Sequence, residues 1–177
     1  DIWNDIEKVA KGLNVENRGI ELVKTLKDKT QELNQSVKEF PVKTVACIEW
    51  IDPLMAAGNW VPTLVELAGG QNLFGEAGKH SPWMDFKALK AKDPDVIIVM
   101  PCGYNISKTI QEMKVLTDHP QWGSLNAVKQ ARVYLTDGNQ YFNRPGPRII
   151  DSLEILMEIL HEGKFDFSHH KSGWIKL

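Results

Sequence analysis

The sequence predicts an α/β lobe of three layers, in which helices cover both faces of a mainly parallel central sheet. From about residue 40 onward, short β-branched runs alternate with helical patterns, which is typical of parallel sheets with right-handed crossovers. The run at 96–100 is apolar throughout, as in a strand buried on both faces. At roughly 150 residues per domain, the 177 residues predict a single domain.

Two helices are expected ahead of this unit. The apolar residues of 2–13 share one helical face, and Gly12 and Asn14 end that helix. The segment 16–38 predicts a longer helix whose apolar positions form a narrow stripe among charged and amide residues. The stripe consists of Ile20, Val23, Leu26, Leu33 and Val37. A narrow stripe on a long charged helix favours a helix that lies across a surface.

The remaining elements follow in chain order. Strands are predicted at 42–48, 72–74, 96–100 and 132–136. Helices are predicted at 60–67, 85–92, 106–116 and 147–160. Gly69 and Gly70 end the first of these helices, and Asp85 caps the second. The pattern therefore predicts a helical segment over 1–39 that includes a long helix, followed by a Rossmann-like lobe over 40–177.

Composition argues against several classes of protein. A formal net charge of −2 and a pI of about 6.2 argue against a nucleic-acid binder, which would carry a basic patch. No apolar run approaches the roughly 20 residues that cross a membrane. Cys47 and Cys102 are too few for a disulfide scaffold. The chain begins with Asp1 and not with Met, so we expect it to be processed or excised from something longer.

The carboxyl ends of the predicted strands are where a ligand is expected, because ligands bind beyond these ends in parallel α/β folds. Four loops at this edge, 49–53, 78–83, 101–104 and 137–148, bring aromatic, amide and cationic side chains together. The candidate ligand-binding residues are Trp50, His80, Trp83, Cys102, Gly103, Tyr104, Asn139, Tyr141, Phe142, Arg144 and Arg148. The loops predict a large, partly aromatic and partly cationic binding surface.

Tryptophan is unusually frequent, at six of the fifteen aromatic residues (6 Trp, 3 Tyr, 6 Phe). Trp50 and Trp83 lie in loops at the ligand edge and are candidate stacking surfaces, whereas core packing explains the others, Trp3, Trp60, Trp122 and Trp174. Arg144 and Arg148 flank the segment 145–147, where two prolines fix the backbone at a helix entrance. Their guanidinium groups suit carboxylate, amide or phosphate oxygens, and a surface salt bridge is the alternative.

Catalytic and metal-binding motifs are largely absent. The sequence contains neither a G-x-S-x-G elbow nor a G-x-x-x-x-G-K-[ST] phosphate loop. Cys102 at a strand end with His80 nearby leaves a Cys–His enzyme domain as an alternative, against simple packing of a small Cys. No two histidines have the helical spacing of a zinc site, so no protein-held metal is expected. His80 alone could ligate a metal that the ligand brings with it.

Four segments resemble the cobalamin-type branch of the class III substrate-binding proteins of ABC importers. They are DGNQYFNRPGPR (137–148), HSPW (80–83), PDVIIVMPCG (94–103) and VELAGGQNLF (65–74), and the resemblance covers about 42–162. That family has two α/β lobes joined by one long rigid helix, with the ligand between the lobes. The resemblance implies that residues 1–39 are the end of a missing N-terminal lobe plus the interlobe helix. Residues 40–177 would be the C-terminal ligand-binding lobe.

The resemblance also implies a function without chemical conversion. The expected ligand is bulky: a corrinoid such as cobalamin first, with haem or a ferric siderophore next. Trp83 matches the family's ligand-stacking aromatic, and 139–148 matches its second binding segment. Trp50 matches a loop that faces the cleft. No resident cofactor is implied, because cobalamin or the iron chelate is the ligand itself.

The partners implied are a small-molecule ligand, an ABC permease and the missing lobe. The resemblance implies that such proteins dock on the permease through acidic residues. In this sequence, Lys87 and Ala88 occupy the positions where a glutamate is expected. Asp85 or Glu66 is therefore the remaining candidate for docking. The implied location is periplasmic or extracytoplasmic. The missing glutamate keeps a cytoplasmic corrinoid-binding role as an alternative. A single lobe could also dimerise through its exposed cleft or the helix at 16–38.

Overall fold

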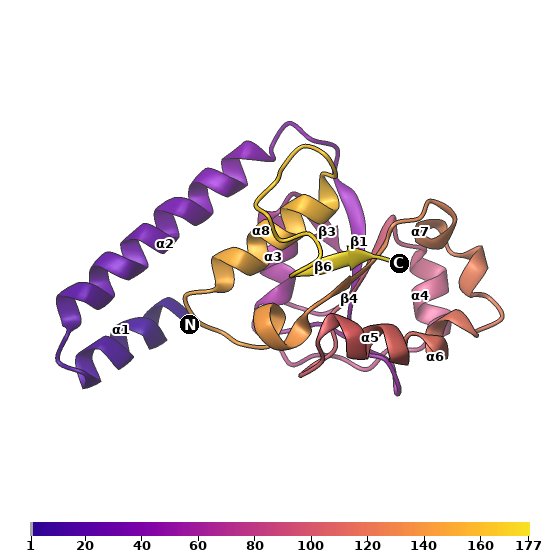
Figure 1. Cartoon of the computed structure of the whole chain (residues 1–177), viewed down its shortest axis with the longest axis horizontal. Coiled ribbons are helices and arrows are strands. Elements are labelled where there is room, and N and C mark those ends of the chain that lie inside the picture. The colour runs from indigo at the N-terminus through magenta and orange to yellow at the C-terminus, as the bar shows by residue number, and fades with distance from the viewer. Residues whose placement is uncertain (1) are drawn as a thin grey trace.

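The computed structural model describes residues 2–177 and places one sheet between two layers of helices (Figure 1). The strands are β1 (Lys43–Trp50), β2 (Met55–Ala56), β3 (Gly70–Asn72), β4 (Val96–Val99), β5 (Val133–Thr136) and β6 (Trp174–Lys176). Their order is β2-β1-β4-β5-β6, and β3 also pairs with β1. Strands β3, β1, β4 and β5 run parallel, whereas β2 and β6 are antiparallel to their neighbours. The predicted three-layer lobe with a mainly parallel sheet is confirmed.

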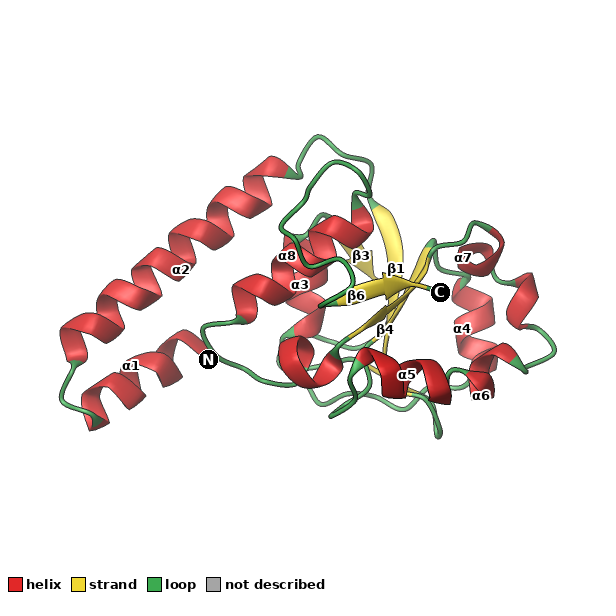
Figure 2. Ribbon diagram, in the orientation of Figure 1, coloured by secondary structure: helices red, strands yellow, loops and turns green. Residues whose placement is uncertain are grey.

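The helices divide between the two faces of the sheet. They are α1 (Ile2–Gly12), α2 (Glu16–Ser36), α3 (Val61–Leu67), α4 (Phe86–Lys92), α5 (Ile106–Glu112), α6 (Lys114–Thr117), α7 (Asn126–Lys129) and α8 (Ile149–Leu160). Helices α3 and α8 cover one face, with the second half of α2 packed against them, and α4, α6 and α7 cover the other face (Figure 2). None of the described helices is both long and apolar enough to cross a bilayer.

The central strands contribute side chains to two separate cores. Val45 and Cys47 of β1 pack toward α3 and α8, whereas Ala46 and Ile48 pack toward α4, α6 and α7. Strand β4 alternates in the same way, and each of its four residues is at most 1% exposed. Burial of one such aliphatic side chain contributes about 1.5–3 kcal/mol. Two-sided burial explains why the sequence of β4 shows no polar alternation.

Helices α1 and α2 form a hairpin that projects from the lobe (Figure 1). The hairpin is tight because a Cβ at Gly19 would collide with the Cβ of Ala10. Leu26 and Leu33, farther along α2, are buried in the lobe core. Ile20 of the predicted stripe, by contrast, is 59% exposed. Only the second half of α2 lies across the lobe.

Several predicted boundaries differ from the structure for local reasons. The helix expected at 106–116 is two short helices that meet at Met113. Gly70 does not cap α3 but begins β3, and Gly69, at φ +80°, makes the turn alone. The sequence patterns missed the two short antiparallel strands and a π-helical turn at Gly138–Phe142. A strand of two or three residues is too short to show a periodicity.

The C-terminal segment folds back on the lobe through one buried carboxylate. Glu158 of α8 is 3% exposed and accepts hydrogen bonds from the Nε1 of Trp174 (2.5 Å) and from two backbone N–H groups. These backbone donors belong to Phe167 (2.5 Å) and His169 (3.4 Å). These hydrogen bonds position the segment that precedes β6, and β6 pairs with β5 at the edge of the sheet. Burial of Trp174 and Trp122 agrees with their predicted packing role.

His161 joins the ends of two helices. Its ring is 5% exposed, packs 4.8 Å from Phe40 between ring centroids, and lies with Nε2 2.8 Å from the carbonyl oxygen of Ala68. Burial lowers the pKa of His161, with the hydrogen bond to Ala68 acting in the opposite direction. The imidazole thus serves as a neutral partner for the last carbonyl groups of α3.

Candidate ligand-binding site

The loops after β1, β4 and β5 lie together at one edge of the sheet, as the sequence predicts. The N–H of Cys102, after β4, donates to the carbonyl oxygen of Glu49 in β1 at 3.1 Å. The N–H of Asn139, after β5, donates to the carbonyl oxygen of Tyr104 at 3.1 Å. A Cβ at Gly138 would collide with the carbonyl oxygen of Pro101, so the third loop needs glycine to approach the second. These contacts build one continuous face.

Trp50 and Tyr104 form an aromatic pair on this face. Their ring centroids are 5.3 Å apart and the planes are inclined by 53°. The indole Nε1 of Trp50 donates to the carbonyl oxygen of Asp52 at 3.0 Å, which fixes the orientation of the ring. The ammonium group of Lys108 lies 5.5 Å from the centre of the Tyr104 ring. Two predicted candidates are thus brought together in a defined geometry.

Trp83 is the most exposed aromatic ring of the candidate set, with 67% of its surface accessible. Its backbone is nevertheless well held, because the strand-like segment 82–84 pairs with the segment 54–56. The N–H of Ala56 donates to the carbonyl oxygen of Pro82, and the N–H of Met84 donates to that of Leu54, both at 3.0 Å. A large apolar ring on a fixed backbone and open to solvent is well suited to stacking on a ligand.

The loop that carries His80 is held against the rest of the binding face by a close backbone contact and by side-chain hydrogen bonds. Gly58 approaches it so closely that a Cβ would lie 2.6 Å from the carbonyl oxygen of Lys79. The hydroxyl of Ser81 accepts from the N–H of Gly58 at 3.1 Å and donates to Oε2 of Glu49 at 2.6 Å. The His80 side chain itself is exposed. The residues described by the structure include no group of three His, Cys, Asp or Glu side chains placed to hold a metal ion.

The π-helical turn after β5 buries two of the candidate aromatic rings. Tyr141 is 9% exposed and Phe142 is 1% exposed, so both pack in the core, and Phe142 also lines a small cavity on the binding face. The side chain of Asp137 begins this turn by accepting from the N–H of Gln140 at 2.8 Å. The hydroxyl of Ser152 on α8 donates to the Tyr141 carbonyl oxygen. The wide turn directs successive side chains inward, which a loop assignment did not anticipate.

The two arginines differ in their surroundings. Arg144 is exposed and donates from Nε and Nη2 to the backbone and side-chain oxygens of Asn139, at 3.0 and 2.9 Å. This bidentate contact holds two predicted candidates together. Arg148 instead pairs with Asp151 at 3.0 Å and lies 4.7 Å above the ring of Tyr141. For Arg148, the structure therefore shows the surface salt bridge that the sequence left as the alternative.

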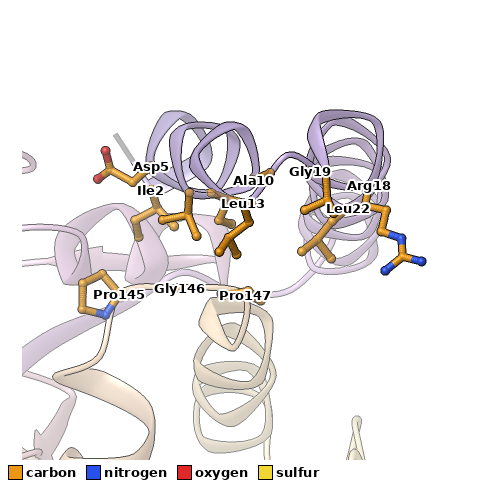
Figure 3. Close-up of a pocket in the computed structure, with 13 residues that line it drawn as sticks. Ile2, Asp5, Ala10, Leu13, Arg18, Gly19, Leu22, Pro145, Gly146 and Pro147 are labelled. Carbon is orange, nitrogen blue, oxygen red and sulfur yellow. The ribbon is translucent and has the colours of Figure 1, made fainter.

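Segment 145–147 faces the helical hairpin. Figure 3 shows Pro145, Gly146 and Pro147 opposite the apolar side chains of α1 and α2. Between them lies a cavity of about 400 Å³. The loop that continues from the binding face thus also forms one wall of a groove beside the hairpin, a second role that its sequence did not reveal.

The two cysteines occupy contrasting environments. Cys102 is exposed at the end of β4, next to Gly103 at φ +76°. Cys47 is fully buried in β1, and burial, together with the charge of Glu49, raises the pKa of its thiol to about 12. Only Cys102 is therefore accessible from the binding face.

Four residues of this face were not named individually as candidates, although Glu49 and Asn143 lie in the loops 49–53 and 137–148 that were expected at the ligand edge. Glu49, Asn59, Trp60 and Asn143 line a cavity of about 190 Å³ that also contacts Cys102. Glu49 stands at the end of a predicted strand beside Trp50, so its position in the sequence was a usable signal. Trp60 was assigned to packing, and its Nε1 is buried without a hydrogen-bond partner among the residues described.

Asp85 and Glu66, the two candidate residues for docking to a permease, both lie at the surface. Glu66 is exposed on α3. Asp85 is exposed at the start of α4, where its carboxylate accepts from the N–H of Ala88 at 2.7 Å and caps the helix as predicted. Lys87, in the neighbouring turn, is also exposed. This end of α4 therefore presents one carboxylate already engaged in capping and one exposed ammonium group.

Comparison with known families decides the class of protein. The family described as Periplasmic binding protein matches residues 1–140. The chain belongs to the periplasmic binding protein family. The class III resemblance is thereby confirmed, and membership of a family of non-catalytic binding proteins argues against the alternative of a Cys102–His80 enzyme. No curated protein matches the sequence.

Solved structures of periplasmic binding proteins share the fold. An ABC transporter substrate-binding protein from Listeria monocytogenes is 18% identical, with a TM-score of 0.78, over 90% of this chain and 63% of that one. IsdE from S. aureus, complexed with heme, is 18% identical, with a TM-score of 0.76, over 90% and 64%. An ABC-type Fe³⁺-hydroxamate transport system from Saccharomonospora viridis is 19% identical, with a TM-score of 0.73, over 90% and 55%. The chain thus spans less than two thirds of these structures.

Proposed function

We propose that this periplasmic binding protein chain is the C-terminal lobe of the substrate-binding component of an ABC importer. It holds a bulky ligand between two lobes without converting it, and a corrinoid such as cobalamin is the first candidate. The observation that carries this proposal is the continuous face formed by the loops after β1, β4 and β5. On this face the Trp50–Tyr104 pair and the exposed ring of Trp83 are available to a large planar ligand.

The corrinoid is favoured by the polar groups around these rings. Asn139, Arg144 and the half-buried Asn143 offer amide and guanidinium groups. Such groups suit the carboxamides at the edge of a corrin ring. Haem or a ferric siderophore is the alternative ligand, and two of the solved relatives are described with heme or with Fe³⁺-hydroxamate transport. Aromatic rings and arginines suit each of these ligands, and their relative affinities distinguish them.

The helical hairpin supports the assignment of residues 1–39 to a missing lobe and an interlobe helix. Val9 and Leu13 of α1 are 61% and 68% exposed, and Ile20 of α2 is 59% exposed. Apolar exposure on this scale is typical of a surface that another element covers. We infer that an N-terminal lobe covers it, and that dimerisation of a single lobe uses the same surface or the cleft when that lobe is absent.

The partner and compartment follow from the same proposal. A permease would meet the exposed acidic residues Glu66 and Asp85, with the protein outside the cytoplasm. Because Lys87 stands beside Asp85, this docking is expected to be weaker than one through two free carboxylates. A cytoplasmic corrinoid-binding protein, which needs no permease, is the alternative.

Tryptophan fluorescence tests the proposed function. Cyanocobalamin added to the two-lobed protein is expected to quench the emission saturably, because the candidate ligand edge carries Trp50 and Trp83. The 177-residue lobe alone is expected to bind at least tenfold more weakly, since half of the cleft is absent. A solution of N-acetyltryptophanamide corrects for light absorbed by the ligand. Absence of saturable quenching by cyanocobalamin, haemin and a ferric trihydroxamate alike would contradict the proposal.

A further inference from the structure

The small cavity on the binding face has a distinct chemical character. Its volume is about 190 Å³, room for several non-hydrogen atoms, given that a water molecule occupies roughly 30 Å³ of liquid. Glu49 supplies the one carboxylate among the residues described as lining it, and no lining residue is cationic. Asn59 and Asn143 supply carboxamides, and Trp60 supplies an indole. The cavity thus combines these polar groups with apolar walls from Val61 and Phe142, and its one charged side chain is the acid Glu49.

Glu49 is held in place while part of its carboxylate stays available. Its Oε2 accepts from the hydroxyl of Ser81 at 2.6 Å, whereas its Oε1 has no partner among the described hydrogen bonds. The residue is half-buried at the end of β1. Its charge acts on the interior as well, because it contributes with burial to the raised pKa of Cys47. A fixed, partly desolvated carboxylate discriminates strongly between ligands of different charge.

We propose that this cavity is a subsite for an uncharged hydrogen-bond donor of the ligand, namely a primary carboxamide, and that Glu49 selects against ligands that place a carboxylate there. This inference rests on the proposed function and specifies the ligand chemistry of the same face. The carboxamide N–H groups donate to Oε1 of Glu49, in a charge-assisted hydrogen bond. The carboxamide oxygen accepts from an amide group of Asn59 or Asn143.

A carboxylate in the same position would be repelled. It would have no proton to donate to Glu49, and two negative charges would share a partly desolvated cavity without a cation in its lining. The subsite therefore favours a corrinoid, whose edge carries several primary carboxamides, over haem, whose two propionates are anionic.

The test measures the affinities of cyanocobalamin and haemin for the two-lobed protein and for its Glu49→Gln variant. Glutamine keeps the size of the side chain but removes its charge. We expect Glu49→Gln to weaken cyanocobalamin binding at least fivefold and to strengthen haemin binding at least threefold. Glu76→Gln is the matched control, because Glu76 is exposed, pairs with Lys79 and does not line the cavity. The control is expected to leave the affinity ratio within twofold of the wild type.

A second measurement needs no variant. A cyanocobalamin derivative in which one peripheral carboxamide is hydrolysed to a carboxylate is compared with the parent compound on the wild-type protein. At least one such isomer is expected to bind tenfold more weakly or worse. An affinity ratio unchanged by Glu49→Gln, or equal affinity for all the isomers, would overturn the inference and leave the proposed function intact. Binding of neither cyanocobalamin nor haemin by the wild type would overturn both.

Discussion

Replacing Trp83 by alanine is expected to weaken binding of cyanocobalamin to the two-lobed protein at least tenfold. Tenfold corresponds to about 1.4 kcal/mol at 25 °C. The large indole ring is 67% exposed on a backbone fixed by hydrogen bonds from Ala56 and Met84, so it is preorganised to stack on a planar ligand. The same exposure means that its removal leaves no cavity in the core. The melting temperature of the variant should therefore stay close to that of the wild type.

Two further variants serve as controls for Trp83→Ala. Val42 is also 67% exposed but precedes β1, at the opposite edge of the sheet, so Val42→Ala should leave the affinity unchanged. Trp83→Phe keeps an aromatic face and should recover part of the lost affinity. If Trp83→Ala binds the ligand as tightly as the wild type, the ligand does not stack on this ring and the site assignment is wrong.

Glu158→Ala is expected to have the largest effect on stability. Three donors converge on this buried carboxylate: the indole N–H of Trp174 and the backbone N–H groups of Phe167 and His169. A buried donor left without a partner costs about 1–3 kcal/mol, so the free energy of unfolding should fall by about 3 kcal/mol or more. Urea denaturation followed by circular dichroism measures this difference.

Glu162→Ala is the matched control for Glu158→Ala. Glu162 is exposed, pairs at the surface with Lys176 in an interaction worth at most about 1 kcal/mol, and also acts on the nearby Tyr134, but it has no buried backbone donors to satisfy among the described hydrogen bonds. Its removal should change the stability far less than removal of Glu158. Equal stabilities for the two variants would show that the C-terminal segment is not held by the buried carboxylate.

The sequence predicted the parts of the fold that depend on periodicity and burial. Strands β1 and β4 are recognisable because both of their faces are buried, and Asp85 caps α4 as its sequence position indicates. The long helix was also recognised, but the exposure of Ile20 was not. A stripe of apolar residues shows which side of a helix can be covered, and it does not show how far the cover extends.

The candidate site was predicted in its location more than in its detail. The rule that ligands bind at the carboxyl ends of parallel strands placed Trp50, Tyr104 and Asn139 on one face. It did not reveal that a π-helical turn buries Tyr141 and Phe142, because such a turn has no sequence signature. The cavity beside Glu49 is formed by three loops that come together only in the folded chain. It could therefore not be predicted from any single segment of the sequence.

Hydrogen–deuterium exchange of the two-lobed protein, with and without saturating cyanocobalamin, locates the ligand on the protein. The proposed binding site is the face built by the loops after β1, β4 and β5. We expect slower exchange in 49–52, 78–83, 101–104 and 139–144, and unchanged exchange in 114–130, which covers the sheet face away from α3 and α8. Protection in 114–130 with none in the four loops would contradict the account.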